Sequence, residues 1–208
     1  MKRNLYTLIY ASVLGTVCAL LLTAAAQVTG PRYQANKEAE KNRHILHALG
    51  VPLAEDATAA RVLETFEENV RAETLGDLTL FVYRDPEAPD KVLALAVPFA
   101  GPGLWGPVKG FLALEPDRTT IRGITFYEHE ETPGLGGEIE APWFKEQFVG
   151  KRIEGADGRA GMKILMAGGS RGVNEVNGIT GATLTCNKVQ AMLNDAIQKI
   201  IEEAKSNG

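Results

Sequence analysis

The chain begins with a long uncharged apolar run. After Lys2 and Arg3 no charged residue occurs until Arg32, and residues 5–28 are long enough to cross a bilayer core of ~30 Å as a helix. A cleaved signal peptide is the alternative, because Ala24-Ala25-Ala26 resembles a cleavage site. The uncharged run exceeds the usual apolar region of a signal peptide, so we expect a retained transmembrane anchor.

Beyond the anchor, the hydrophobic pattern changes from helical to strand-like and back. Residues 34–49 and 59–75 have helical patterns, residues 141–149 a short helix, and residues from about 186 to 204 an amphipathic helix. Strand-like runs separated by Pro, Gly and Asp occupy residues 78–83, 92–99, 108–114, 121–127 and 162–166. Helices that flank consecutive strands predict an α+β fold with a largely antiparallel sheet.

The positive charges at Lys2 and Arg3 predict the orientation of the anchor. They place the N-terminus in the cytoplasm and the rest of the chain across the membrane, although Arg32 and Lys37 reduce the asymmetry. We therefore expect a cytoplasmic N-terminus and anchor over residues 1–30, a stalk over 31–57, and an extracytoplasmic domain over 58–208.

Composition narrows the possible functions. The 208 residues are 45% hydrophobic and carry a net charge of -4, which predicts one main domain and no nucleic-acid partner. Cys18 and Cys186 are too far apart in the sequence and too few for a disulfide framework or a zinc site. His44 and His47 have a spacing compatible with a metal, but no third ligand follows, so we expect packing or solvent-facing roles.

Residues 176–186, VNGITGATLTC, contain three threonines just before the last predicted helix. Thr185 is placed to cap that helix through its side-chain oxygen. Thr183 precedes a helix N-terminus, where free N–H groups and the macrodipole favour an anion, and Gly181 and Ala182 allow a bulky phosphorylated ligand to approach. A hydroxyl-rich turn that only caps the helix is the simpler interpretation.

A resemblance to a known motif favours a phosphorylated ligand at Thr183 over a turn that only caps the helix. Thr180-Gly181-Ala182-Thr183 resembles the S/T-G-A-T sequence of FMN-binding domains in bacterial respiratory complexes, where a flavin transferase joins FMN to the last threonine by a phosphoester. The resemblance implies one covalent FMN at Thr183. Those motifs usually carry Asp at the position of Asn177, and restoring Asp would raise the modified fraction if the transferase requires the acid.

Two further strings resemble a particular family. The E-T-P-G-L-G-G-E-I segment at 131–139, and G-L-W at 103–105 followed by G-F-L-A-L at 110–114, are similar to the C subunit of the sodium-translocating NADH:quinone oxidoreductase. With the single span, the resemblance covers nearly the whole chain. The G subunit of the RNF complex shares the flavinylation motif and E-T-P-G-L-G, and is the nearest alternative.

This resemblance implies an electron-relay subunit in the bacterial inner membrane, with other members of the complex and a flavin transferase as partners. We expect that it is not catalytic alone. It contains no G-x-G-x-x-G motif after a strand for NADH, and its lone uncharged span is unsuited to ion translocation, which we expect of partner subunits together with quinone reduction. A membrane-anchored binding or assembly module without flavin is the alternative from another class. The expected cofactor-binding residues are Leu104, Trp105, Glu131, Thr132, Gly134, Leu135, Thr180, Gly181, Ala182, Thr183, Leu184 and Thr185.

The chemistry assigns roles to some of these residues. Trp105 and Leu135 offer aromatic and apolar walls, Thr132 a hydroxyl, and backbone N–H groups over 131–136 donors for a reduced ring. Trp105 is equally suited to capping a core. The carboxylates of Glu130 and Glu131 point to opposite faces and are expected in a solvated loop rather than in acid–base catalysis. Cys186 is expected to be a small apolar residue of the first helical turn.

Overall fold

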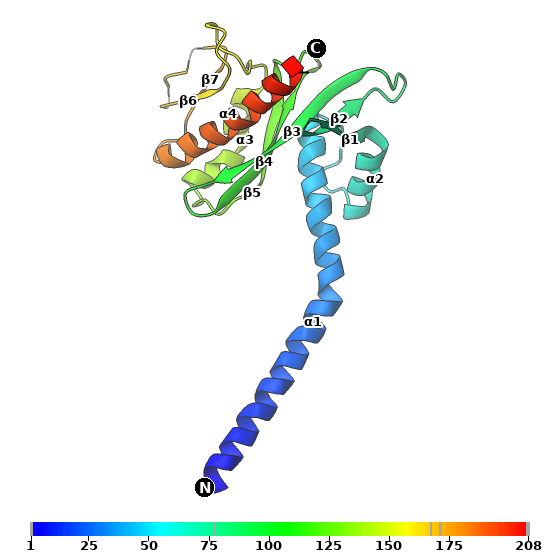
Figure 1. Ribbon diagram of the computed structural model, residues 1–208, viewed down its shortest axis with the longest axis vertical. Coiled ribbons are helices and arrows are strands. Elements are labelled where there is room, and N and C mark those ends of the chain that lie inside the picture. The colour runs from blue at the N-terminus through cyan, green and yellow to red at the C-terminus, as the bar shows by residue number, and fades with distance from the viewer. Residues whose placement is uncertain (1, 77, 167, 171, 207–208) are drawn as a thin grey trace. The chain divides into compact units, whose positions relative to one another are not determined.

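The computed structural model describes residues 2–76, 78–166, 168–170 and 172–206 (Figure 1). The chain divides into two compact units, Met1–Ala39 and Glu40–Gly208. The first unit is a single helical segment, and the second contains the sheet and the remaining helices.

Helix α1 (Lys2–Leu49) begins with the apolar run. Every residue from 5 to 29 is exposed, including large apolar side chains such as Leu8 and Leu21. Exposure of so much apolar surface is unfavourable in water and favourable in a bilayer, and this helix is long and apolar enough to span one. The helix continues through Pro31, so the helix expected over residues 34–49 is the last part of α1.

The second unit is built on a five-stranded antiparallel meander. Neighbouring strands in the sheet are also neighbours in the sequence, and β3 and β4 pair continuously from Leu95 opposite Leu114 to Pro102 opposite Pro107. The strands are β1 (Val70–Leu75), β2 (Leu78–Arg84), β3 (Val92–Pro102), β4 (Pro107–Leu114) and β5 (Ile121–Glu128). A separate parallel pair consists of β6 (Lys163–Leu165) and β7 (Glu175–Asn177). The predicted α+β class with a largely antiparallel sheet is confirmed.

The helix predicted over residues 59–75 is partly wrong. Helix α2 (Ala59–Asn69) begins at its N-cap Thr58 and ends where the Val70 N–H donates to the Phe66 carbonyl. Val70 then starts β1, whose six residues pair with β2. Val70 lies on the apolar face of the helical pattern, but pairing with β2 buries it in the sheet instead, so tertiary contact overrides the local period.

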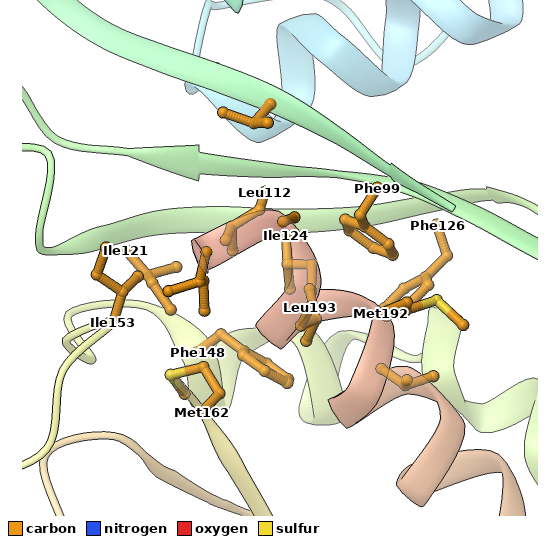
Figure 2. Packing of buried hydrophobic residues seen from close by; sticks show 14 of the residues in the cluster. Phe99, Leu112, Ile121, Ile124, Phe126, Phe148, Ile153, Met162, Met192 and Leu193 are labelled. Carbon is orange, nitrogen blue, oxygen red and sulfur yellow. The ribbon is translucent and has the colours of Figure 1, made fainter. Parts of the chain in front are cut away.

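One face of the sheet packs against helix α4 (Thr183–Ser206). Figure 2 shows Phe99, Leu112, Ile124 and Phe126 of the sheet directed toward α4, close to its Met192 and Leu193. The Phe99 and Phe126 rings meet edge to face with centroids 5.5 Å apart. Alternation along the strands supplies this face, and helical spacing supplies the matching stripe on α4. Together they form the main hydrophobic core.

The end of α1 belongs to the second unit. Ile45, Leu46 and Leu49 are fully buried, and the Thr125 hydroxyl of β5 donates to the His44 carbonyl at 3.1 Å. A Cβ at Gly123 would lie 2.9 Å from the Ala48 carbonyl oxygen, so the helix backbone lies directly against β5. The segment expected as a stalk over residues 31–57 is therefore divided in the structure, with its part from Glu40 onward in the second unit.

Short helical elements after β5 add buried side chains to the core that also contains α4. The helix expected over 141–149 is present as α3 (Pro142–Lys145) followed by a 3-10 turn, η2 (Glu146–Phe148), and another 3-10 turn, η1 (Gly136–Glu140), precedes them. These turns bury Ile139, Phe144 and Phe148 in the cluster that contacts α4. Strand β7 was not predicted, because three residues carry too little periodic signal.

We expect Leu193→Ala to lower the free energy of unfolding by about 2–5 kcal/mol, because Leu193 is fully buried between α4 and the sheet. Gln198→Ala, on the exposed face of the same helix, should change it by less than about 0.5 kcal/mol. Denaturant unfolding of the detergent-solubilised chain, followed by circular dichroism, measures both. Equal effects of the two substitutions would contradict the assigned core.

Candidate functional site

Three segments far apart in the sequence meet beside the N-terminus of α4. They are the β3–β4 hairpin tip at residues 103–106, the loop at 129–135 after β5, and the turn at 178–182 before α4. Hydrogen bonds between residues 26 to 54 positions apart join the first two segments to each other and to α4. The sequence-predicted site residues all lie on these three segments or in the first turn of α4. Nine of them are exposed and three are buried: the exposed ones are Leu104, Trp105, Thr132, Gly134, Leu135, Thr180, Gly181, Thr183 and Leu184, and the buried ones are Glu131, Ala182 and Thr185.

The hairpin tip presents apolar side chains to the outside. The Gly103 N–H donates to the Gly106 carbonyl at 2.8 Å, which closes a tight turn. Leu104 and Trp105 occupy the tip and are 43% and 69% exposed. Trp105 therefore does not cap the core, which was the alternative role for it.

The loop after β5 adds a third exposed apolar residue. Leu135 is 45% exposed, and its side chain lies over the backbone of Gly181, where a Cβ would be 3.1 Å from Leu135 Cδ2. The expectation of free backbone donors in this loop is wrong for two residues. The Glu131 N–H donates to His129 Nδ1, and the Leu135 N–H donates to the Thr132 carbonyl, because the loop folds into tight turns.

Helix α4 starts three residues earlier than predicted. Gly181 has φ +80°, a conformation that favours glycine, and the Cys186 N–H donates to the Ala182 carbonyl at 3.0 Å, which begins the helix at Thr183. Ala182 is buried, whereas Thr183 and Leu184 are exposed. The Thr183 hydroxyl thus lies in the first turn, where the positive end of the helix dipole favours a phosphate group.

Two predicted roles are corrected by one buried pair. Thr185 lies inside α4 and does not cap it: its hydroxyl donates to Glu131 Oε2 at 2.6 Å. Glu131 is buried, not solvated. Its Oε1 accepts from the Leu104 N–H at 2.6 Å and the Trp105 N–H at 3.3 Å, so the carboxylate is satisfied by protein donors. Glu130, next to it, is exposed as expected. No sequence signal paired Glu131 with Thr185.

Two cavities flank the turn before α4. One, of about 390 Å³, includes Thr183 in its wall. The other, of about 530 Å³, lies on the side of Gly134 and Trp143. Both include Gly178, Ile179 and Thr180, so the turn forms a wall shared by the two cavities.

Asn177 and Gln147 hold this turn in place, a role that sequence reasoning missed. Gln147 donates to the Asn177 carbonyl at 3.2 Å and accepts from the Asn177 N–H at 2.8 Å. Asn177 Oδ1 accepts from the Ser170 N–H at 3.1 Å. The Asn177 side chain therefore serves as a hydrogen-bond acceptor, a role that a carboxylate also fills.

Of the two histidines considered as metal ligands, His44 is half-buried and His47 is exposed. Burial lowers the pKa of His44, although Glu40, 3.3 Å from His44 Nε2, opposes the shift, and burial also lowers the pKa of His47. Across residues 2–76, 78–166, 168–170 and 172–206, no group of three or more His, Cys, Asp and Glu residues is arranged to hold a metal ion.

The fold and the site together bear on the class of protein to which the chain belongs. An antiparallel sheet carries a helix whose first residue is an exposed threonine, and the two segments that converge beside this helix carry exposed apolar side chains. The sequence model of the FMN-binding domain matches residues 103–198, which contain all three converging segments.

Individual relatives define the family. The C subunit of the Na(+)-translocating NADH-quinone reductase of Vibrio alginolyticus is 30% identical over 85% of this chain and 84% of its own. The same subunit from Yersinia pestis is 30% identical over 97% and 95%. The crystal structure of the Parabacteroides distasonis C subunit has a TM-score of 0.69 at 26% identity, over 82% of this chain and 94% of its own. This chain belongs to the family of C subunits of Na(+)-translocating NADH-quinone reductases.

Cys186 lies close to Thr183, and its environment argues against a reactive thiol. The side chain is buried, its Sγ accepts from the Ile179 N–H at 3.3 Å, and burial raises the pKa of the thiol. These features agree with the predicted role as a small apolar residue of the first turn.

Two variants are compared, both with Cys18→Ser: one keeps Cys186, and the other carries Cys186→Ala and Asn187→Cys. We expect maleimide at pH 7 to label Cys186 roughly tenfold or more slowly than the cysteine at position 187. Asn187 is exposed on the same turn. Mass spectrometry over time measures both rates. Equal rates in the folded chain would contradict the buried placement.

Proposed function

We propose that this chain is the electron-transferring C subunit of a sodium-translocating NADH:quinone reductase, with one FMN joined to Thr183 by a phosphoester. The exposed Thr183 hydroxyl at the first residue of α4, beside exposed apolar side chains from two other segments, carries the proposal. Membership in the C subunit family supports it, and favours this complex over the RNF alternative.

Thr183 suits a phosphate tether for three reasons. Its hydroxyl is accessible to a transferase because the residue is exposed. The first turn of α4 directs backbone N–H groups and a partial positive charge toward the phosphate. The buried neighbours Ala182 and Thr185 fix the backbone on both sides of it, so the tether starts from a rigid point.

Leu104, Trp105, Leu135 and Leu184 would hold the ring system. Large exposed apolar side chains on separate elements of one site are typical of a surface that a flat apolar ligand covers. When bound, FMN supplies the redox chemistry, because it accepts and releases electrons one or two at a time. The chain's part is to bind the ring, limit its contact with water and keep it at a fixed place for electron transfer.

The anchor sets the compartment of this chemistry. Lys2 and Arg3 before the span favour a cytoplasmic N-terminus, which would place the domain over residues 58–208 outside the cytoplasm of a bacterial inner membrane. Quinone reduction and ion movement would belong to partner subunits. A flavin transferase would load Thr183 during maturation.

Thr183→Ala is expected to abolish covalent flavin. Coexpression with a flavin transferase should give a wild-type band that fluoresces under ultraviolet light on a denaturing gel and gains the mass of one FMN. Thr183→Ala should be dark and unmodified, since no hydroxyl remains to form the ester. Asn187→Ala, an exposed change in the same turn, should stay fluorescent.

A dark wild-type band, under conditions that label a known substrate of the transferase, would favour the membrane-anchored module without flavin. A fluorescent Thr183→Ala band would place the attachment on another residue.

Asn177→Asp is expected to raise the modified fraction without altering the fold. The substitution keeps the acceptor for the Ser170 N–H, so the free energy of unfolding should change by less than about 0.5 kcal/mol. A gain in modified fraction, measured by intact mass, would then report recognition of the acid by the transferase. An unchanged fraction would show that the amide suffices.

A further inference from the structure

The Glu131 carboxylate contacts both the hairpin tip and α4. Its Oε1 accepts from the N–H groups of Leu104 and Trp105, and its Oε2 accepts from the Thr185 hydroxyl. All three partners are donors, and a deprotonated carboxylate accepts from each of them. Glu131 is 5% exposed as a residue, so water offers little competition for these bonds.

Two glycines leave the space that the carboxylate fills. A Cβ at Gly103 would lie 2.5 Å from Glu131 Oε1, and a Cβ at Gly136 would lie 2.5 Å from Oε2 and 2.6 Å from the Thr185 hydroxyl. Real Cβ atoms do not approach other atoms so closely. The packing around the carboxylate therefore has no room for a side chain at either glycine.

The placement of the three donors links the tether to the wall of the site. Thr185 is two residues beyond Thr183 on α4, and Trp105 carries the aromatic side chain of the hairpin tip. Strands β3 and β4 make their last pair at Pro102 and Pro107, so the tip extends beyond the sheet. The bonds to Glu131 join this tip to the loop after β5 and, through the Thr185 hydroxyl, to α4.

We propose that Glu131 is a positioning residue of the flavin site, which holds the Trp105 hairpin tip at a fixed distance from the first turn of α4. It acts through Trp105 and Thr185 and does not itself contact the cofactor. This inference rests on the proposed function, because the benefit of the fixed distance is a ring held between Trp105 and its tether at Thr183. It also reassigns Glu131, which the sequence placed among cofactor contacts.

Removing either end of the link tests the proposal. Glu131→Ala deletes the acceptor, and Thr185→Val deletes one donor with almost no change in volume, so the second variant is expected to fold if the first does not. Asp195→Ala is the matched control, because Asp195 is an exposed acidic residue of α4. All are made in the full chain, coexpressed with a flavin transferase and purified in detergent.

Amide hydrogen exchange reads the link directly. We expect exchange at the hairpin tip, residues 103–106, to become roughly tenfold faster or more in Glu131→Ala, and faster to a smaller degree in Thr185→Val, while exchange in β4 stays near the wild-type rate. Adding Thr185→Val to Glu131→Ala should cause no further change, since both act on one contact. Asp195→Ala should match the wild type.

The bound flavin gives the second readout. Flavin should remain attached in both variants, because Thr183 is intact, but its visible circular dichroism should weaken and its fluorescence in the native protein should rise as Trp105 moves away. A role in stability alone would alter exchange throughout the sheet and leave the flavin spectra of the folded fraction unchanged.

The outcomes separate the two proposals. Wild-type exchange at the hairpin tip in both variants, or unchanged flavin spectra in folded and labelled variants, overturns the positioning role and leaves the covalent flavin standing. A wild-type chain without flavin overturns the proposed function, and the exchange measurement alone then decides whether Glu131 holds the tip to α4.

Discussion

The packing of α4 on the sheet is the constraint on which the rest of the structure depends. The apolar stripe of the helix is buried against alternate residues of the strands, so neither element can shift by one residue without exposing its apolar side chains (Figure 2). The contact extends to the end of β3, where a Cβ at Gly101 would lie 3.1 Å from Met192 Cβ. Since Thr183 is the first residue of α4, the hydrophobic core also determines where the flavin would be attached.

Charges near the first turn of α4 add to the effect of the packing, which already fixes where this turn lies. The first turn of α4 offers a partial positive charge, and two negative groups share it in our interpretation: the buried Glu131 carboxylate, reached through Thr185, and the phosphate of a flavin on Thr183. The groups approach from different sides, one from inside the domain and one from solvent. The chain as a whole carries a net charge of -4, so this local field does not follow from the overall charge.

The two ends of helix α1 have surfaces suited to different environments, lipid for the first part and a protein core for the last. Over residues 5–29 the helix is apolar on all sides and exposed, which suits lipid, whereas Ile45, Leu46 and Leu49 near its end form one buried face that suits a domain in water. A continuous helix thus serves as anchor in its first part and as core element in its last. This explains why the hydrophobic pattern predicts two helices separated near Gly30 and Pro31.

The sequence by itself determined the anchor, four of the five strands of the sheet, the amphipathic last helix, the family and the candidate threonine, because each leaves a periodic or contiguous signal among neighbouring residues. The same local signal misassigned Val70, which pairing with Tyr83 places in a strand. It also misassigned Thr185 and Glu131, 54 positions apart, as a helix cap and a solvated residue. Only the tertiary structure decided that pair and the exposure of Trp105. Hydrogen bonding and burial depend on which distant segments meet in space, and the spacing of residues along one segment does not determine this.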